Sequence, residues 1–460
     1  MHMNNHSISN PNIDLPIFES SCPIGVKIVI EKLKQAGFKA YLVGGCVRDL
    51  LLKRIPHDFD VTTNATPNEV LDLFAHAIPT GIAHGTITVI EQGEQIEVTT
   101  FRSEGQYQDH RHPDFVQFVN DVKEDLARRD FTINAMAWDA QEGLIDPFKG
   151  QHDLQEGIVR AVRDPFERMS EDALRMFRAF RFAGRYQFEI EAKTKQAIDT
   201  LYPLAQNVAV ERIVSEVEEI LANSPQILDQ MTLLLQPWIP QLDVCLHTQQ
   251  NSIYHYTDVL HHTLDALSAL QNKEPVCLWA LLLHDLGKPK VKQTYNGKDH
   301  FKKHERESVK IAQEVTQKLK LPKKMSNEIF KLIALHDTFL KPTPQSFYWL
   351  HVDKDLNAEE TKHLFAIQYG DIMAHSQHDR LKALESYARY DQSRQGILPM
   401  RTKDLLVNGN DLKKEFGLQG KEIGIILEQL LYEVVMQDRN MNRQEQLALV
   451  QVMLQGRKNQ

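Results

Sequence analysis

Residues 41–60 read YLVGGCVRDLLLKRIPHDFD, and this stretch decides the fold. It predicts a short apolar strand, a tight turn at Gly44 and Gly45, a helix and a second strand. Because glycine has no Cβ, such a turn lets backbone N–H groups approach phosphate oxygens, and the start of a helix favours their negative charge. Arg48 adds a guanidinium that can hold a phosphate with two hydrogen bonds. The turn is therefore a candidate phosphate site, although a plain strand-to-helix turn would look the same.

Two aspartates close the same stretch. Asp58 and Asp60 have i, i+2 spacing on the expected second strand, so both carboxylates point to one face. Carboxylates held that close repel each other, and a divalent cation removes the repulsion. A solvated sheet edge would also explain the pair, but a phosphate-binding turn followed by paired carboxylates is what two-metal nucleotidyl transfer requires. Glu97, in IEVTT, is a candidate third catalytic carboxylate, with an exposed hairpin acid as the alternative.

The rest of the chain changes character near residue 155. Residues 66–76 begin with the capping-box pattern of a helix, and residues 85–101 alternate apolar and polar residues around a glycine, as a β-hairpin does. Beyond residue 155 the strand pattern fades and 3.6-residue periodicity takes over. The sequence therefore predicts a mixed α/β region followed by a nearly all-helical one.

The composition is that of a folded protein. Of the 460 residues, 42% are hydrophobic and 25% are charged. The longest apolar runs, such as residues 276–283, are shorter than the roughly 20 residues of a membrane-spanning helix. Residues 1–20 lack the basic start and apolar core of a secretory signal. We therefore expect a soluble, cytoplasmic protein with no membrane partner.

The net charge limits the mode of nucleic-acid binding. The 53 basic and 62 acidic side chains give a net charge of −9, which argues against coating nucleic acid over the whole surface. A local basic groove remains compatible with this value. The four cysteines lack zinc-like spacing, so we expect them to be buried thiols.

Five segments, in order, resemble the motifs of class II tRNA nucleotidyltransferases and bacterial poly(A) polymerases. The first is residues 41–60. The others are LARRDFTINAMAWD (126–139), IDPFKG (145–150), SEDALRMFRAFRF (170–182) and VERIVSEVEEIL (210–221). Five ordered motifs are far more specific than any one of them. The resemblance covers residues 24–225 and implies a polymerase-β-like head followed by neck, body and tail helices.

The resemblance also implies roles for residues of the head. Asp58 and Asp60 would bind metal, with Mg²⁺ as the expected ion. In RRDFTIN, Asp130 would contact the ribose, while Arg128 and Arg129 would lie near the triphosphate or the ribose. Asn134 would lie nearby. A surface charge cluster at the start of a helix is the alternative explanation for this segment.

The fourth segment is expected to form one helix with Ser170 as its N-cap. On such a helix Asp172 and Arg175 would share a face. The resemblance implies that this pair reads the incoming base; a salt bridge is the alternative. An aspartate can accept from the exocyclic amine of cytosine or adenine while an arginine donates to the ring nitrogen, whereas uracil and guanine present an N–H there. Glu171 would orient Arg175 or cap the helix, and Arg178 is a further candidate nucleotide contact.

Residues 103–118 resemble the flexible loop of relatives that add both C and A. This makes an enzyme that adds only two C residues the less favoured alternative. An enzyme that adds only A stays open.

A second set of candidate residues lies in the helical half. LLLHDLGKPK, at residues 281–290, places His284 and Asp285 after an apolar run. His262 precedes them, and Asp371 follows. Imidazole and carboxylate ligands in such an order suit a divalent metal that activates water. The spacing resembles the HD superfamily of metal-dependent phosphohydrolases over residues 255–380.

That second resemblance implies a metal site of uncertain metal identity. Its ligands would be His262, His284, Asp285 and Asp371, with His304 and His336 as further candidates. His261 could replace His262, and an inactive scaffold is the alternative to an active hydrolase. The nearby lysines form a local basic tract, in which Lys288 and Lys290 are candidates to face a phosphate.

Together these patterns predict an α+β chain with a polymerase-β-like head of mixed sheet and helices, then an all-helical neck, an HD body and a tail. The expected divisions are a polar tail (1–22), the nucleotidyltransferase head (23–155), the neck (156–222), the HD body (223–385) and the C-terminal tail (386–460). The expected function is addition of C, C and A to the tRNA 3′ end from CTP and ATP without a template. The HD body would hydrolyse phosphates at 3′ ends. No obligate protein partner is inferred.

Two alternatives to this function stay open. The first is a poly(A) polymerase or an A-only enzyme. The second is an HD phosphohydrolase with a head that only tethers RNA. Intact Asp58, Asp60, Asp172 and Arg175 argue against the second.

Overall fold

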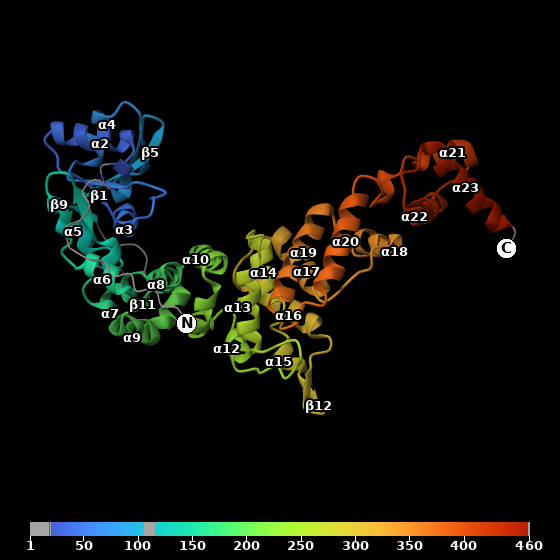
Figure 1. Ribbon diagram of the computed structural model, residues 1–460. Coiled ribbons are helices and arrows are strands. Elements are labelled where there is room, and N and C mark those ends of the chain that lie inside the picture. Colours follow the sequence, from blue (N-terminus) through green and yellow to red (C-terminus); the bar gives the residue numbers. More distant parts are fainter. Residues whose placement is uncertain (1–17, 19, 105–115, 459–460) are drawn as a thin grey trace. The chain divides into compact units, whose positions relative to one another are not determined.

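The computed structural model of the protein describes Phe18, residues 20–104 and residues 116–458 (Figure 1). The chain divides into two compact units, Met1–Pro237 and Trp238–Gln460. Within the described residues, no helix is both long and apolar enough to cross a membrane. Most of the predicted flexible loop, residues 105–115, lies outside the described residues.

The head is built on a seven-stranded mixed sheet. Its strand order is β3-β4-β5-β2-β1-β8-β9, and β2 and β5 are parallel while the other neighbours are antiparallel. The strands are β1 (Ala40–Val43), β2 (Val61–Thr63), β3 (Ala77–Gly81), β4 (Thr86–Glu91), β5 (Glu94–Thr100), β8 (Ala137–Asp139) and β9 (Gly143–Ile145). Every residue of β1 is buried. The predicted strand, turn and helix of residues 41–60 are confirmed. The second strand begins only at Val61, so Asp58 and Asp60 precede it, and the prediction that both lie on the strand is wrong.

Helices and short elements complete the head. They are α2 (Ile24–Gln35), α3 (Gly45–Leu51), α4 (Pro67–Leu73), α5 (Val122–Ala127), α6 (Gly150–Glu156), η1 (Ile82–His84), η2 (Thr132–Asn134) and the pair β6 (Arg102–Glu104) and β7 (Val116–Phe118). The predicted capping box at Thr66 and Glu69 is present at the start of α4. Phe18 is buried and stacks on Trp138, with 4.7 Å between ring centroids. The end of the predicted polar tail therefore packs on the head.

Between the head and the end of the first unit, the chain is helical apart from a two-residue parallel ladder. This ladder joins β10 (Ile158–Val159) and β11 (Glu189–Ile190). The helices are α7 (Pro165–Glu171), α8 (Leu174–Tyr186), α9 (Ala192–Leu201), η3 (Tyr202–Asn207), α10 (Val210–Asn223), η4 (Pro225–Gln230) and α11 (Thr232–Leu235). Helix α8 presents a strongly apolar face that includes Phe177 and Phe180, and it packs against α10.

The single helix predicted for residues 170–182 is wrong. Asp172 has extended backbone angles (φ −137°, ψ 103°) and separates α7 from α8. Its carboxylate accepts a hydrogen bond from the Leu174 N–H at 3.1 Å, so it competes with a continuous helix for that donor. Ser170 is not an N-cap, because it lies inside α7 and donates to the Glu167 carbonyl at 2.9 Å. The cap of α7 is Asp164.

The second unit is helical, with one inserted hairpin. Helix α14 (Pro275–Leu283) is apolar on all sides and packs against α13, α16, α17 and α19. The other elements up to α20 are α12 (Gln241–Leu246), α13 (Val259–Ala269), α15 (Lys288–Val291), β12 (Gln293–Tyr295), β13 (Lys298–His300), α16 (His304–Lys318), α17 (Lys323–Leu335), α18 (Pro344–Tyr348), η5 (Trp349–Asp353), α19 (Ala358–Met373) and α20 (Leu381–Arg394).

The C-terminal helices pack on a separate apolar cluster. They are η6 (Thr402–Asp404), α21 (Gly409–Phe416), α22 (Lys421–Met436) and α23 (Arg443–Lys458). Phe347 of α18 is buried in the same cluster as Leu412, Leu430 and Val450. This cluster joins the start of α18 to the last three helices.

Candidate functional site

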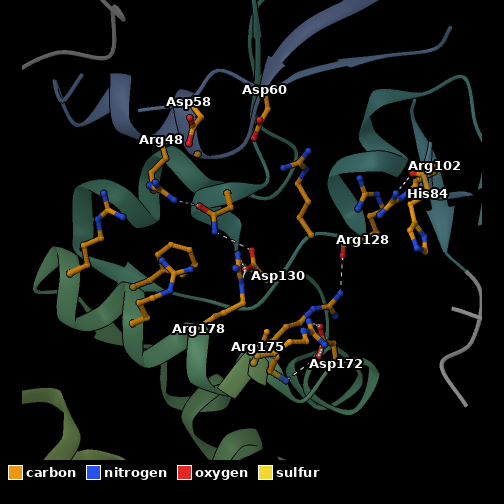
Figure 2. Close-up of a pocket in the computed structure, with 18 residues that line it drawn as sticks. Arg48, Asp58, Asp60, His84, Arg102, Arg128, Asp130, Asp172, Arg175 and Arg178 are labelled. Atoms are coloured by element: carbon orange, nitrogen blue, oxygen red, sulfur yellow. Dashed lines mark hydrogen bonds and ion pairs between the residues drawn. The ribbon is translucent and has the colours of Figure 1, made fainter. Parts of the chain in front are cut away.

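A charged cavity of about 890 Å³ lies in the first unit (Figure 2). Its described lining has nine arginines but only four aspartates, so it favours a polyanion. The residues are Gly45, Arg48, Asp58, Asp60, His84, Arg102, Arg128, Arg129, Asp130, Asn134, Asp172, Leu174, Arg175, Arg178, Arg181, Phe182, Arg185 and Arg212. The structure therefore brings together eleven predicted site residues from three of the sequence motifs. Gly44 and Glu97 are outside this lining.

The glycine turn holds the helix start against residues 129–136. Gly44 has φ +76°, and a Cβ there would lie 2.5 Å from a guanidinium nitrogen of Arg129. Its N–H donates to the Met136 carbonyl at 3.0 Å, so this donor belongs to the sheet, and Gly45 is the glycine that faces the cavity. Arg48 donates to Asn134 Oδ1 at 2.5 Å. The turn thus packs against Arg129 and leads into α3, which carries Arg48.

The two carboxylates of the acid pair differ in environment. The Asp58 side chain is 82% exposed, and its Oδ1 lies 3.0 Å from His57 Nδ1. Burial raises the pKa of Asp60, Arg129 lowers it, and the charges of Glu97 and Asp58 raise it, so that the pKa lies at about 6. Glu97 is exposed on β5, where Val98 is the register partner of Val61. The mutual repulsion of these acids is what a bound cation would relieve, so the donor set fits a divalent ion.

Asp130 is the centre of a buried hydrogen-bond network. Its Oδ1 accepts from the Phe131 N–H at 2.8 Å and from Asn134 Nδ2 at 3.1 Å. Its Oδ2 accepts from Arg178 Nε at 2.8 Å. Burial alone would raise the pKa of Asp130, but the Arg178 charge and these hydrogen bonds lower it to about 2. Asp130 is therefore ionised at neutral pH, and Arg178 is bound to it.

Asp172 and Arg175 both reach the cavity, but from different elements. Because Asp172 lies between α7 and α8, the predicted shared helix face is wrong. Arg212 of α10 holds Asp172, with 2.8 Å between Arg212 Nη2 and Asp172 Oδ2. Arg175 donates to Glu171 Oε2 at 2.6 Å and to the Arg168 carbonyl at 3.0 Å, so Glu171 contacts Arg175 directly, as expected if Glu171 orients it.

The predicted site lacked several residues of the cavity lining, among them Arg212, His84 and Arg102. Arg212 lies in the fifth motif, where a basic residue within a recognised motif was a signal that could have identified it. His84 and Arg102 reach the cavity from η1 and β6, and no sequence pattern marked them. Arg102 also donates to the His84 carbonyl.

The second set of candidate residues forms a buried cluster in the second unit. His262, His284, Asp285 and Asp371 come from α13, the end of α14 and α19, and their ligand atoms all lie within 4.8 Å of one another. Asp285, His304 and His336 form a second such group, so Asp285 belongs to both. All six candidates are therefore brought together. His261 points elsewhere, since its Nδ1 lies 2.7 Å from Asp258 Oδ2 at the cap of α13.

Backbone carbonyls orient three of these imidazoles. His284, His304 and His336 each place Nδ1 within 2.6–2.9 Å of a carbonyl three residues earlier. Nδ1 therefore carries the proton, and Nε2 faces the cluster, as in histidines that bind metals. His304 Nε2 and His336 Nε2 lie 3.0 Å apart, so at most one of them can donate to the other. These converging nitrogens fit a cation.

The charges of the cluster are strongly coupled. Burial would lower the pKa of His284, but Asp285 and Asp371 raise it to about 10. Burial would raise the pKa of both aspartates, yet the neighbouring cations hold it well below its usual range. Within the described part of the chain, His284 Nε2 and both Asp285 oxygens make no hydrogen bond of good geometry. A divalent ion could replace the imidazolium charge and take these atoms as ligands.

Three further residues adjoin this cluster. His255 and His375 form a group with His262, and neither stood out in the sequence, because they approach it only through folding. Lys288 is buried, with Nζ 2.6 Å from Asp285 Oδ2, so it faces the carboxylate directly. Lys290 is exposed and pairs with Glu307 at 2.6 Å. A cavity of about 470 Å³ opens onto Asp285, His304, His336 and Asp371.

Three family descriptions match the chain. Residues 40–160 match the poly A polymerase head domain, and residues 253–367 match the HD domain. Residues 187–246 match a family described as a probable RNA and SrmB-binding site of polymerase A.

Individual relatives point the same way. The CCA-adding enzyme of Lactobacillus helveticus is 55% identical over 188 residues, 41% of this chain and 47% of the relative. That of Anoxybacillus flavithermus is 48% identical over 218 residues, 46% of this chain and 55% of the relative. The crystal structure of the Bacillus stearothermophilus CCA-adding enzyme in complex with CTP has a TM-score of 0.70 at 28% identity and covers 96% of this chain and 99% of that one.

The chain resembles the CCA-adding enzymes. This confirms the predicted resemblance and the fold class. The matches span about half the length of these curated CCA-adding enzymes.

The buried cluster predicts a sharp difference between adjacent histidines. A cation that binds only the folded protein, at a concentration of 100 times its dissociation constant, raises the free energy of unfolding by about 2.7 kcal/mol. His262→Ala should abolish the stabilisation that Mn²⁺ gives to the second unit and should lower the metal bound per chain. His261→Ala, the matched control, should keep both. Thermal unfolding and elemental analysis measure these effects, and equal behaviour of the two variants would contradict the assignment.

Proposed function

We propose that the chain adds C, C and A to the 3′ end of tRNA, using CTP and ATP without a nucleic-acid template. The observation that carries this proposal is one cavity holding an acid pair, an arginine-rich wall and a fixed aspartate–arginine set. The names of the similar CCA-adding enzymes support it, as does the relative crystallised in complex with CTP. From this substrate class we infer a cytoplasmic location.

In this proposal the acid pair holds a divalent cation, for which we infer Mg²⁺. Such an ion supplies Lewis-acid chemistry for nucleotidyl transfer. Arg48, Arg128 and Arg129 bind the triphosphate, because planar guanidinium groups match phosphate oxygens. The ionised Asp130 accepts a hydrogen bond from a ribose hydroxyl. Asn134 holds the Asp130 carboxylate in place by donating to its Oδ1. Glu97 acts by raising the negative charge around Asp60.

Base selection falls to Asp172 and Arg175. The Asp172 carboxylate accepts from the exocyclic amine of cytosine or adenine, and Arg175 donates to the neighbouring ring nitrogen. Arg212 and Glu171 each hold one of these side chains, which limits their freedom to adapt to a different base. UTP and GTP then leave buried groups without partners, and that costs free energy.

The test of the main proposal is incubation of the full chain with tRNA that lacks its 3′ end. CTP and ATP together should extend it by C, C and A, while an A-only enzyme needs only ATP and a poly(A) polymerase adds an unlimited A tail. Asp60→Ala should reduce addition to background while tRNA binding persists. Near-normal addition by that variant would overturn the assignment of the acid pair.

Arg175→Ala tests the base-reading set. Loss of one hydrogen-bonding partner should lower the preference for CTP and ATP over UTP and GTP by roughly 10- to 100-fold, about 1.4–2.7 kcal/mol. The measurement is kcat/KM for each of the four nucleotides. Arg185→Ala is the control, because Arg185 also lines the cavity but lies at the far end of α8. Unchanged selectivity in Arg175→Ala would show that Arg175 only forms a structural ion pair with Glu171.

We also propose that the HD site hydrolyses phosphate esters at RNA 3′ ends. The observation that favours it is the buried histidine–aspartate cluster beside a cavity. Water adds to phosphorus, the bond from phosphorus to the ribose oxygen breaks, and a proton from the water passes to that oxygen. A 3′-phosphate or 2′,3′-cyclic phosphate is the logical substrate, because either blocks the hydroxyl that nucleotide addition needs.

The two activities should separate. Asp285→Asn should abolish hydrolysis and spare nucleotide addition, because the two sites belong to different compact units and share no residue. Asp60→Ala should do the reverse. Hydrolysis is measured on tRNA with a 2′,3′-cyclic end, and nucleotide addition is measured on the same tRNA with a free 3′-hydroxyl. Absence of hydrolysis with Mg²⁺, Mn²⁺, Ni²⁺ and Co²⁺ would show that the HD region is a scaffold.

A further inference from the structure

A β-hairpin interrupts the helical HD region between two candidate metal ligands. Strands β12 and β13 span residues 293–300, after Asp285 and before His304. In Figure 1 the hairpin projects from the helices of its unit. Residues 298–303, from β13 to the start of α16, line the same cavity as Asp285, His336 and Asp371. The hairpin therefore stands at the entrance to the candidate hydrolytic site.

A buried aspartate anchors the base of the hairpin. Asp299 accepts hydrogen bonds from the Asn251 N–H at 2.9 Å and from the Thr294 hydroxyl at 2.6 Å. Lys292 Nζ lies 2.9 Å from Asp299 Oδ2. Burial would raise the pKa of Asp299, but these partners lower it to about 2. Its negative charge is thus neutralised at the base and is not available to the lysines outside.

Three lysines of this region keep a free charge. Residues 288–303 contain six lysines and one aspartate, in a chain of net charge −9. Lys288, Lys290 and Lys292 are ion-paired with Asp285, Glu307 and Asp299. Lys298, Lys302 and Lys303 are exposed and have no ion pair within the described residues. Three unpaired cations at the rim of a cavity bind a chain of phosphates more tightly than they bind a single small anion.

An aromatic ring accompanies these lysines. Tyr295, beside the hairpin turn, is 59% exposed, and its ring centroid lies 5.9 Å from that of His300. An exposed aromatic ring next to free cations is the combination that holds single-stranded nucleic acid, with a base stacked on the ring and its phosphates on the lysines. Neither feature is required for hydrolysis of a small ester that fits inside the cavity.

We propose that the hairpin surface, formed by Tyr295, Lys298, Lys302 and Lys303, binds the single-stranded 3′ end of an RNA. The HD site then acts on terminal phosphates of RNA in preference to small phosphate esters. The inference rests on the proposed hydrolytic function, for which it names the surface that binds the substrate.

The kinetic test compares a polymer with a small ester of the same chemistry. The substrates are tRNA ending in a 2′,3′-cyclic phosphate and free 2′,3′-cyclic AMP. The triple variant Lys298→Ala, Lys302→Ala, Lys303→Ala should lower kcat/KM for tRNA at least tenfold, mainly through KM, and leave that for cyclic AMP within twofold. Tyr295→Ala should act in the same direction. An equal loss on both substrates would overturn the proposal and leave the hydrolytic function standing.

A matched control removes the same charge elsewhere. Lys323, Lys324 and Lys362 are exposed in the same unit and lie outside the cavity lining. Their triple substitution by alanine should leave hydrolysis of tRNA unchanged. A loss as large as that of the hairpin variant would show a general charge effect and contradict a dedicated surface.

A cross-linking test works without hydrolysis. RNA with a 3′-terminal 4-thiouridine and a 3′-phosphate, irradiated with the full chain, should form adducts within residues 293–303. These adducts should disappear in the hairpin triple variant. If they form and no ester is hydrolysed, the docking surface stands and the hydrolytic function fails. Adducts confined to other segments would overturn the docking surface itself.

Discussion

Repulsion between acids held close together is the constraint on which the head depends. Burial is the main cause that raises the pKa of Asp60 to about 6, and the nearby charges of Glu97 and Asp58 act in the same direction against Arg129. The sheet imposes this proximity, because Asp60 directly precedes β2 and Glu97 lies on its parallel neighbour β5. A fold that maximised stability would not place them so. Under the proposed function, a bound cation would relieve this repulsion, and the arginines of the cavity would bind the phosphates of the nucleotide.

The second unit meets a similar constraint in a different way. Asp285 and Asp371 are fully buried, and protonated imidazole and Lys288 compensate their charge in the absence of metal. Backbone carbonyls fix the Nδ1 atoms of three histidines and aim Nε2 inward. The polypeptide therefore holds a preformed ligand set that has no role in ordinary core packing. The hairpin beside it adds exposed lysines to the lining of the cavity that opens onto the cluster.

Local patterns in the sequence predicted the fold and most residues of both sites. Residues 41–60 contain an apolar strand, a glycine turn and a helix in immediate succession, and short-range rules are enough to read them. The ordered histidines and aspartates of the HD region were equally legible. Tertiary contacts could not be predicted from the sequence. Arg212 contacts Asp172, and His255 and His375 approach His262, only after helices distant in the sequence pack together. The prediction of one continuous helix across Asp172 was wrong because the Asp172 carboxylate accepts a hydrogen bond from the Leu174 N–H. The periodicity of apolar residues gives no sign of this competing hydrogen bond.

The most direct test of the account is the pH dependence of cation binding by the head. In a chain whose HD cluster is silenced by Asp285→Asn and Asp371→Asn, Mn²⁺ binding can be followed by electron paramagnetic resonance. Protonation of Asp60 below about pH 6 competes with the cation. The affinity should therefore fall roughly tenfold between about pH 8 and about pH 5, and Asp60→Asn should remove both the tight binding and its pH dependence. An affinity that is constant over this range, or that survives in Asp60→Asn, would contradict the account.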